Sequence, residues 1–105
     1  SMVNVSALIW LFERECSAFV LDDFSKMQIV GKNPVFVNKN CRYFSIIPVC
    51  GKVKGLNILG ARYPLKNGKV SPEYIYTTSN EVLPEQTAQV SVKKGFVLLV
   101  EIFSE

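Results

Sequence analysis

The lysines and arginines of this chain are concentrated in its central half, and their spacing is the clearest hint of a chemical role. Between Phe24 and Pro72 the sequence holds nine basic residues and no Asp or Glu, whereas the rest of the chain holds nine acidic residues and three basic ones. If the central strands form one face of the fold, that face carries a positive field that attracts polyanions. The charge separation therefore predicts a negatively charged partner.

Aromatic residues are interleaved with these basic residues. Proteins hold single-stranded nucleic acid by placing basic side chains on phosphates and aromatic rings against bases. The sequence therefore predicts a non-catalytic module that binds RNA or single-stranded DNA. The predicted nucleic-acid-binding residues are Arg42, Tyr43, Lys52, Lys54, Arg62, Tyr63, Lys66, Lys69 and Tyr76.

A second interpretation stays open for the same residues. The lysines are ordinary solvated surface if the acidic residues of the chain ends lie against them, and the tyrosines then belong to the core. In that case the chain is a protein–protein interaction or scaffold domain within a larger assembly, and its partner is a protein that pairs with a strand edge.

The residue types needed for catalysis are sparse. The chain has no histidine, so it lacks the usual general base at neutral pH and the usual activator of a cysteine nucleophile. Asp22-Asp23 is the one adjacent carboxylate pair, and such neighbours usually cap turns. Cys16, Cys41 and Cys50 do not have the spacing of a zinc site, and the glycines do not have that of a phosphate loop. We therefore predict no enzymatic activity, no cofactor and no metal.

Cysteine usage and hydropathy indicate the compartment. The long cysteine spacings favour free thiols, although one disulfide, Cys41–Cys50 or Cys16–Cys41, stays open, and free thiols suit a reducing environment. No apolar run approaches the ~18–20 residues of a membrane helix, and no signal peptide is visible. The sequence predicts an intracellular protein, cytoplasmic or nuclear, without membrane contact.

Chain length predicts a single domain. The 105 residues have room for one modest core. Ser1 precedes a Met and has the character of a tag-cleavage remnant, so the predicted domain spans residues 2–105.

The pair Asn67-Gly68 is the strongest local signal. Asn-Gly readily takes the positive φ angles of a type I′ turn, and strand-like residues flank it on both sides. We predict a β-hairpin over residues 57–78 in which Arg62 faces Glu73. Pro64 would occupy a hydrogen-bonded position in this register, so an interruption or a bulge is expected there.

The pattern in the rest of the chain predicts short strands. Residues 3–12 alternate with period two, which favours a strand over the alternative of a helix from Ser6 to Phe19. The run 96–100 is apolar on both faces and predicts a central strand. Further strands are expected at 18–21, 27–30, 35–37, 42–49 and 86–92, with a loop at 93–95.

Six to eight short strands without a long helix are typical of an all-β fold. We predict a small closed barrel of the OB type, with five or more strands, because closure hides strand edges. A Tudor-like barrel and a small β-sandwich are the alternatives. The order of an opening hairpin, a strand at 35–37 and a closing pair is similar to that of cold-shock and S1-type barrels, although the aromatic motifs of cold-shock proteins are absent.

Overall fold

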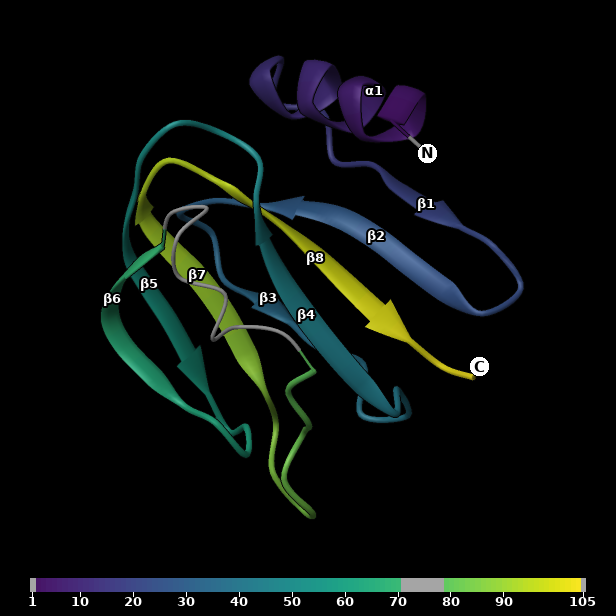
Figure 1. The fold of residues 1–105 in the computed structure, drawn as a ribbon, viewed down its shortest axis with the longest axis vertical. Coiled ribbons are helices and arrows are strands. Elements are labelled where there is room, and N and C mark those ends of the chain that lie inside the picture. The colour runs from purple at the N-terminus through teal and green to yellow at the C-terminus, as the bar shows by residue number, and fades with distance from the viewer. Residues whose placement is uncertain (1, 71–78, 105) are drawn as a thin grey trace.

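The computed structural model describes residues 2–70 and 79–104 (Figure 1). Within them the chain forms one α-helix followed by eight β-strands. In chain order the elements are α1 (Met2–Glu13), β1 (Phe19–Leu21), β2 (Ser25–Val30), β3 (Val35–Phe36), β4 (Tyr43–Pro48), β5 (Val53–Leu59), β6 (Leu65–Val70), β7 (Gln89–Lys94) and β8 (Val97–Ile102).

The strands form two antiparallel sheets of four strands each. Sheet A has the order β1-β2-β8-β4, and sheet B has the order β3-β7-β5-β6. The chain crosses from one sheet to the other after β2, β3, β4 and β7, so strands that are consecutive in sequence often lie in different sheets (Figure 1). The two sheets pack against each other as a β-sandwich.

The predicted all-β class is confirmed, apart from α1, and the small β-sandwich alternative fits the structure. The OB-like closed barrel is wrong, because the described strands form two separate sheets with open edges. Two of these edges are protected by their shortness rather than by closure. β1 has three residues and β3 has two, so each presents few unpaired main-chain groups to another chain.

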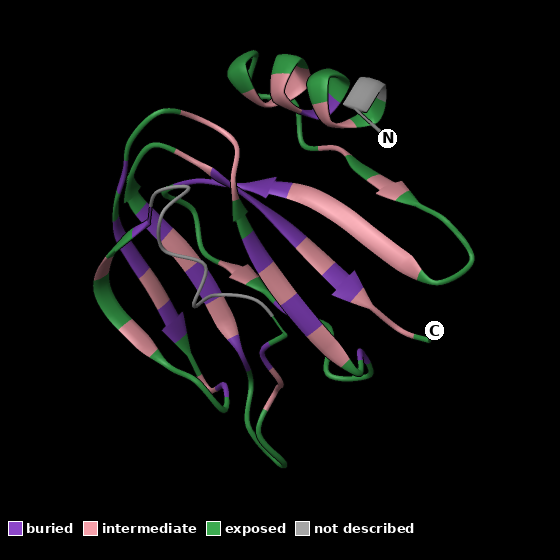
Figure 2. Cartoon of the chain, in the orientation of Figure 1, coloured by how far each residue is buried: buried purple, intermediate pink, exposed green. Residues whose placement is uncertain are grey.

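The main hydrophobic core lies between the sheets (Figure 2). β8 shows how the chain builds it, because alternate side chains of a strand point to opposite faces. Val97 and Leu99 belong to this core, whereas Leu98 and Val100 pack with apolar side chains of α1 on the outer face of sheet A. The prediction of a central strand at 96–100 is therefore confirmed, since β8 lies between β2 and β4.

The N-terminal segment is helical, so the strand favoured for residues 3–12 is wrong. Val5, Leu8, Ile9 and Phe12 recur at intervals of three and four residues, which places them on one side of a helix. They join the cluster on the outer face of sheet A, where Leu8 is 3% exposed. This burial stabilises a helix in a segment whose period-two pattern also allows a strand.

The end of α1 has the hydrogen bonds of a Schellman motif. Glu15 adopts a left-handed conformation with φ 60°, the N–H of Cys16 donates to the carbonyl of Leu11 (2.9 Å), and the N–H of Glu15 donates to that of Phe12 (3.0 Å). These bonds satisfy carbonyls that the end of a helix leaves without partners. They also turn the chain toward β1.

Asn67-Gly68 lies inside β6, so the predicted hairpin turn at this pair is wrong. The chain turns between β5 and β6 instead, and the β5–β6 pairing contains two register shifts. Asn67 does take a positive φ of 51°, but it does so in a bulged strand, where its N–H donates to Asn57 Oδ1 (2.9 Å). Pro64 lies in the turn, where the strand ladder does not need its missing N–H.

The remaining predicted strands are confirmed with small differences at their ends. β1, β2, β3, β4 and β7 each overlap the segment where a strand was expected. The predicted loop at residues 93–95 is shorter, because β7 continues to Lys94 before the chain crosses to sheet A.

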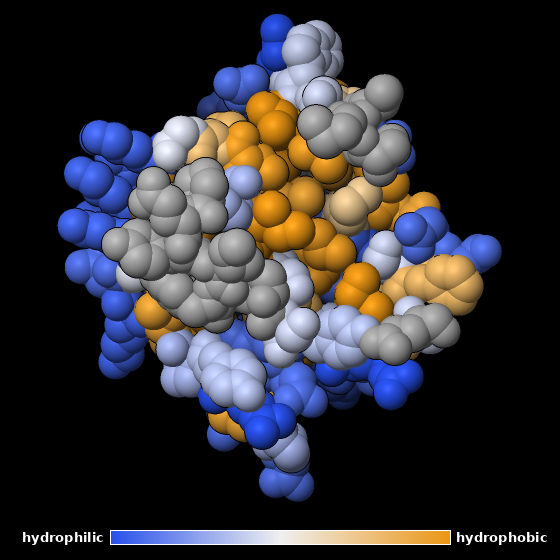
Figure 3. All heavy atoms as spheres, viewed as in Figure 1, coloured by the Kyte–Doolittle hydropathy of each residue, from blue (hydrophilic) through white to orange (hydrophobic). Residues whose placement is uncertain are grey.

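The outer face of sheet A is only partly covered by α1. Figure 3 shows hydrophobic side chains at the surface over β4 and β8, beneath α1, and Ile47 of β4 is 39% exposed. No helix in the described part of the chain is long and apolar enough to cross a membrane, since α1 has 12 residues.

Candidate functional site

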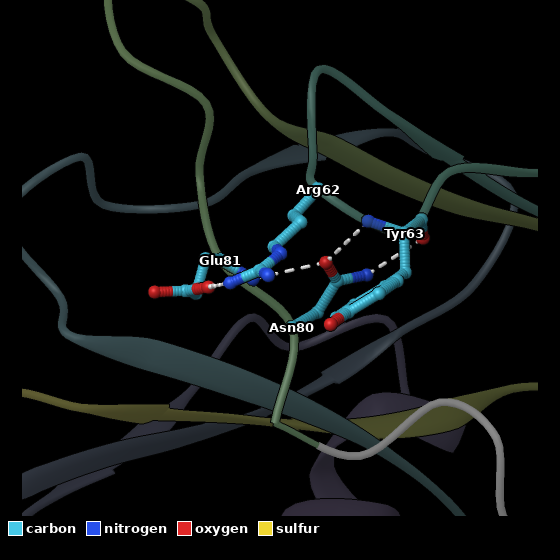
Figure 4. Close-up of polar contacts among 4 residues, drawn as sticks. All are labelled: Arg62, Tyr63, Asn80 and Glu81. Atoms are coloured by element: carbon cyan, nitrogen blue, oxygen red, sulfur yellow. Dashed lines mark hydrogen bonds and ion pairs between the residues drawn. The ribbon is translucent and has the colours of Figure 1, made fainter.

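Asn80 is a buried polar residue that ties together segments far apart in the sequence. Asn80 is 2% exposed, and its main chain forms two hydrogen bonds with the main chain of Phe44 in β4. The side-chain Oδ1 accepts from the N–H groups of Tyr63 (3.0 Å) and Glu81 (2.9 Å), and Nδ2 donates to the carbonyl of Tyr63 (2.8 Å) (Figure 4). All the polar atoms of this amide therefore have main-chain partners, as burial requires.

The segment around Asn80 lies antiparallel to the turn between β5 and β6. Ala61 and Val82 form an isolated bridge, and the N–H of Leu83 donates to the carbonyl of Gly60 (3.1 Å). Gly60 has φ 71°, and a Cβ at this position would collide with the carbonyl oxygen of Thr87. Only glycine combines the positive φ with the absence of a Cβ that this position needs. Gly60 therefore allows the β5–β6 turn to lie close to Thr87.

An ion pair closes the cluster on its solvent side. A guanidinium nitrogen of Arg62 lies 2.8 Å from Oε2 of Glu81, and the Arg62 N–H donates to the Glu81 carbonyl (2.8 Å). The hydrogen bond to Glu81 raises the pKa of Arg62, with further contributions from the charges of Tyr63 and Glu81. Because both side chains are exposed, solvent screens the pair, which orients the groups more than it stabilises the fold.

Arg62, Tyr63, Asn80 and Glu81 together form what we name the Asn80 cluster (Figure 4). Tyr63 is 53% exposed, and the Arg62 guanidinium carbon lies 5.4 Å from the centroid of its ring. The main chain of Tyr63 is held by Asn80 while its ring faces solvent. The exposed ring and the neighbouring Arg62–Glu81 pair offer an aromatic face and charged groups to a ligand.

A second buried polar group, Glu101, lies at the edge of the core. It is 1% exposed, Oε2 accepts from the Asn38 N–H (2.7 Å), and Oε1 accepts from Gln28 Nε2 (3.3 Å). Burial, followed by the charge of Glu101, raises the pKa of the nearby Cys41 thiol to about 11. A protonated buried thiol is a weak nucleophile, so this pair is structural.

The other predicted chemical residues have structural surroundings as well. Asp22 caps the turn between β1 and β2, where Oδ1 accepts from the N–H groups of Phe24 (2.8 Å) and Ser25 (2.7 Å), and these bonds lower the pKa of Asp22. The three cysteines are free thiols. Among the described residues, no three or more His, Cys, Asp or Glu side chains gather as metal ligands would.

Several of the predicted nucleic-acid-binding residues lie apart from one another. Arg42 directly precedes β4 and Tyr43 is its first residue, so both belong to sheet A. Lys52 lies in the connection that leads from β4 to sheet B. Tyr76 lies outside the described residues.

The other predicted residues lie along the β5–β6 hairpin, in two groups at its opposite ends. Lys54 and Lys69 are cross-strand partners on β5 and β6. Arg62 and Tyr63 lie together in the β5–β6 turn, and Lys66 is exposed near the start of β6. The predicted residues are thus divided between both sheets and do not form one continuous face.

Sequence reasoning missed Asn80 and Glu81. It paired Arg62 with Glu73, which lies outside the described residues, whereas the structure pairs Arg62 with Glu81. The sequence signal was a polar Asn-Glu pair in a stretch without strand pattern. Spacing alone does not show that this pair lies beside the β5–β6 turn.

Comparisons with known proteins assign the fold. A family model described as "Thiamin pyrophosphokinase, vitamin B1 binding domain" matches residues 32–97. No curated protein gave a significant match. Among solved structures, thiamine pyrophosphokinase from Bacillus subtilis superimposes with a TM-score of 0.87 at 21% identity, over 99% of this chain and 49% of that one.

Two further structures have the same fold. Thiamin pyrophosphokinase from Geobacillus thermodenitrificans gives a TM-score of 0.79 at 24% identity, over 99% of this chain and 47% of that one. Thiamin pyrophosphokinase from Candida albicans gives 0.76 at 17% identity, over 96% of this chain and 39% of that one. The chain spans about half or less of the length of these three structures.

These matches correct the predicted function. The prediction of a nucleic-acid-binding module is wrong, because the family is defined by vitamin B1 binding. The prediction of no enzymatic activity is contradicted as well, because the family and the structural relatives are named for a pyrophosphokinase. The same finding replaces the protein–protein interaction or scaffold domain as the predicted function, but it does not contradict a protein partner.

The family model covers most of the two sheets. The matched residues 32–97 run from the connection before β3 to the start of β8 and include the whole Asn80 cluster. They make up more than half of the 105 residues. The chain therefore belongs to the family of thiamin pyrophosphokinase vitamin B1 binding domains.

Proposed function

We propose that this chain binds thiamin and supplies it as the acceptor in a diphosphate-transfer reaction. The observation that carries the proposal is the match of residues 32–97 to the vitamin B1 binding domain. The chain spans about half of its structural relatives, so the transfer reaction would also use parts found in the remainder of such proteins. On this proposal residues 2–105 act as one domain.

The chemistry of thiamin supports the Asn80 cluster as the binding surface. Thiamin joins an aminopyrimidine ring to a thiazolium ring with a fixed positive charge. Aromatic faces attract such cations, and the exposed ring of Tyr63 offers one. Glu81 adds a carboxylate that is 46% exposed; its Oε2 pairs with Arg62, and its other oxygen can face the thiazolium charge.

The rigidity of the cluster supports the same assignment. The N–H and the carbonyl of Tyr63 are both hydrogen-bonded to the buried side-chain amide of Asn80. The main chain that carries the Tyr63 ring is therefore held in place. A main chain that is already ordered has less conformational entropy to lose when a ligand binds beside it.

Isothermal titration of thiamin into wild-type protein and Tyr63→Ala tests the proposal. The substitution keeps the main-chain bonds to Asn80 and removes only the ring. We expect wild-type protein to bind thiamin, and the affinity of Tyr63→Ala to fall by about threefold to thirtyfold, the range of a cation–π contact.

Phe36→Ala is the matched control, because Phe36 is also an exposed aromatic residue, 62% exposed, but lies on β3 outside the cluster. Its affinity for thiamin should equal that of wild-type protein. Failure of the wild-type protein to bind thiamin contradicts the proposed function. Equal losses in Tyr63→Ala and Phe36→Ala contradict the assignment to this surface.

A further inference from the structure

A hollow lies at one end of the β5–β6 hairpin, and the Asn80 cluster lies at the other end. Its volume is about 670 Å³. The residues around it come from β5, β6 and β7 and from the β2–β3 and β7–β8 connections, and four of them are exposed lysines. The lining residues are Lys32, Lys54, Gly55, Asn67, Lys93, Lys94 and Gly95.

The strand register forces positive charges next to each other at this end of sheet B. Lys54 pairs with Lys94 on one side and with Lys69 on the other, so three lysines cross three neighbouring strands in a row. Like charges in directly opposite positions destabilise a sheet. Figure 3 shows hydrophilic side chains along this β6 edge.

No described carboxylate neutralises the four lysines of the hollow. In the described part of the chain the one ion pair joins Arg62 to Glu81, at the opposite end of the hairpin. Glu13 and Glu15 line an adjacent groove, between α1 and sheet A, that shares Lys32 and Gly95 with the hollow. The other three lysines of the hollow do not line that groove.

Main chain forms part of the wall of the hollow, and side-chain hydrogen bonds fix its shape. Gly55 has φ 70°, and a Cβ there would collide with Cβ of Lys93, so a larger residue would push into the lysines. Asn57 Nδ2 donates to the Gly55 carbonyl (3.2 Å), and Asn57 Oδ1 accepts from the Asn67 N–H (2.9 Å). These bonds hold the two register shifts of the β5–β6 pairing, at Gly55 and at Asn67, in place before any ligand binds.

We propose that this hollow binds the phosphate groups of a small polyphosphate anion. Four ammonium groups without described carboxylate partners match the several negative charges of a di- or triphosphate, and Lys binds phosphate as a point charge. A hollow of about 670 Å³ has room for more than a single phosphate group. The site is separate from the Asn80 cluster and does not depend on thiamin binding.

Titration calorimetry with inorganic pyrophosphate tests the site on the chain of 105 residues. The test variant is Lys54→Gln/Lys94→Gln, which removes two adjacent charges from the hollow. The control is Lys39→Gln/Lys66→Gln, which removes the same net charge from exposed positions that do not line the hollow. Thermal unfolding of each variant verifies that the fold is retained.

We expect the wild-type protein to bind pyrophosphate more tightly than inorganic phosphate. The hollow variant should lose about tenfold for each lysine, the value of a charge-assisted hydrogen bond, and the control should lose less than about threefold. Equal losses in both variants would show attraction to net charge alone and overturn the site. Absence of pyrophosphate binding at millimolar concentration overturns it too.

Titrations with tripolyphosphate and with ATP distinguish a free phosphate chain from one attached to a nucleoside. Similar affinities for both, each reduced in the hollow variant, support recognition of the phosphates themselves. Binding of ATP without binding of tripolyphosphate would overturn the proposal, because it would place recognition on the nucleoside.

Discussion

The side-chain amide of Asn80 takes the place of a neighbouring strand for Tyr63. Oδ1 accepts from the Tyr63 N–H (3.0 Å) and Nδ2 donates to the Tyr63 carbonyl (2.8 Å), although the residues are 17 positions apart. An amide presents one donor and one acceptor side by side, as a peptide group does. The turn between β5 and β6 therefore has a fixed main chain at the point where an aromatic ring enters solvent.

Asn80→Ala should reduce the free energy of unfolding by about 2–4 kcal/mol, because it leaves part-buried main-chain groups of Tyr63 and Glu81 without their hydrogen-bond partner. Urea denaturation followed by Trp10 fluorescence measures this change. Asn33→Ala, at an exposed asparagine, is the control and should lie within about 0.5 kcal/mol of wild-type protein. Equal stability of the two variants would contradict a structural role for the amide.

Gly60→Ala should destabilise the fold by about 2–4 kcal/mol, since it places a side chain at a left-handed φ and against the Thr87 carbonyl. Gly51→Ala is a matched control, because nothing lies within 4 Å of a Cβ at that position. It should leave stability unchanged or raise it by up to about 1 kcal/mol. Comparison of the two melting temperatures checks this, and a neutral Gly60→Ala would refute the close approach.

Glu101 can be tested by separating charge from hydrogen bonding. Glu101→Ala leaves the Asn38 N–H and the Gln28 amide without their acceptor and should cost about 3 kcal/mol, partly through the cavity it creates. Glu101→Gln keeps one acceptor oxygen, and its amide can donate to Gln28 after a rotation of the Gln28 amide, so it should cost about 1 kcal/mol. Denaturant titration of both variants distinguishes these outcomes, and equal costs would contradict the hydrogen-bonding role.

The raised pKa of Cys41 predicts a loss of stability at alkaline pH. The thiol pKa rises from 9.0 to about 11 through burial and the charge of Glu101. Below pH 9 the thiol is protonated whether the chain is folded or unfolded. Between pH 9 and 11 only the unfolded chain loses the proton, so this group lowers the free energy of unfolding by about 1.4 kcal/mol per pH unit.

Unfolding curves at about pH 8 and about pH 10.5, the latter inside the window set by these two pKa values, measure the effect. Cys41→Ala should show a smaller loss between the two pH values than wild-type protein. Cys16→Ala, at an exposed cysteine, should keep the wild-type pH dependence. An identical pH dependence in Cys41→Ala and wild-type protein would show that the thiol does not contribute.

The sequence determined where most strands lie and that 96–100 is central, because alternation and continuous apolar runs are set by burial over a few residues. It also determined that Asn67 adopts a positive φ. Tertiary structure decided how these local preferences were used. The left-handed Asn67 lies in a bulge of β6 and not in a hairpin turn. Residues 3–12 form a helix because Leu8 is buried on the outer face of sheet A.

Tertiary structure alone decided the pairing of distant segments. Asn80 meets Tyr63, Arg62 meets Glu81, and Lys54 lies between Lys69 and Lys94 through contacts between residues 15 to 40 positions apart. A hydrophobic pattern sets which face of a strand is buried but not which strand lies beside it. That choice depends on how the two sheets close over a shared core, and the chain order of the strands does not reveal it.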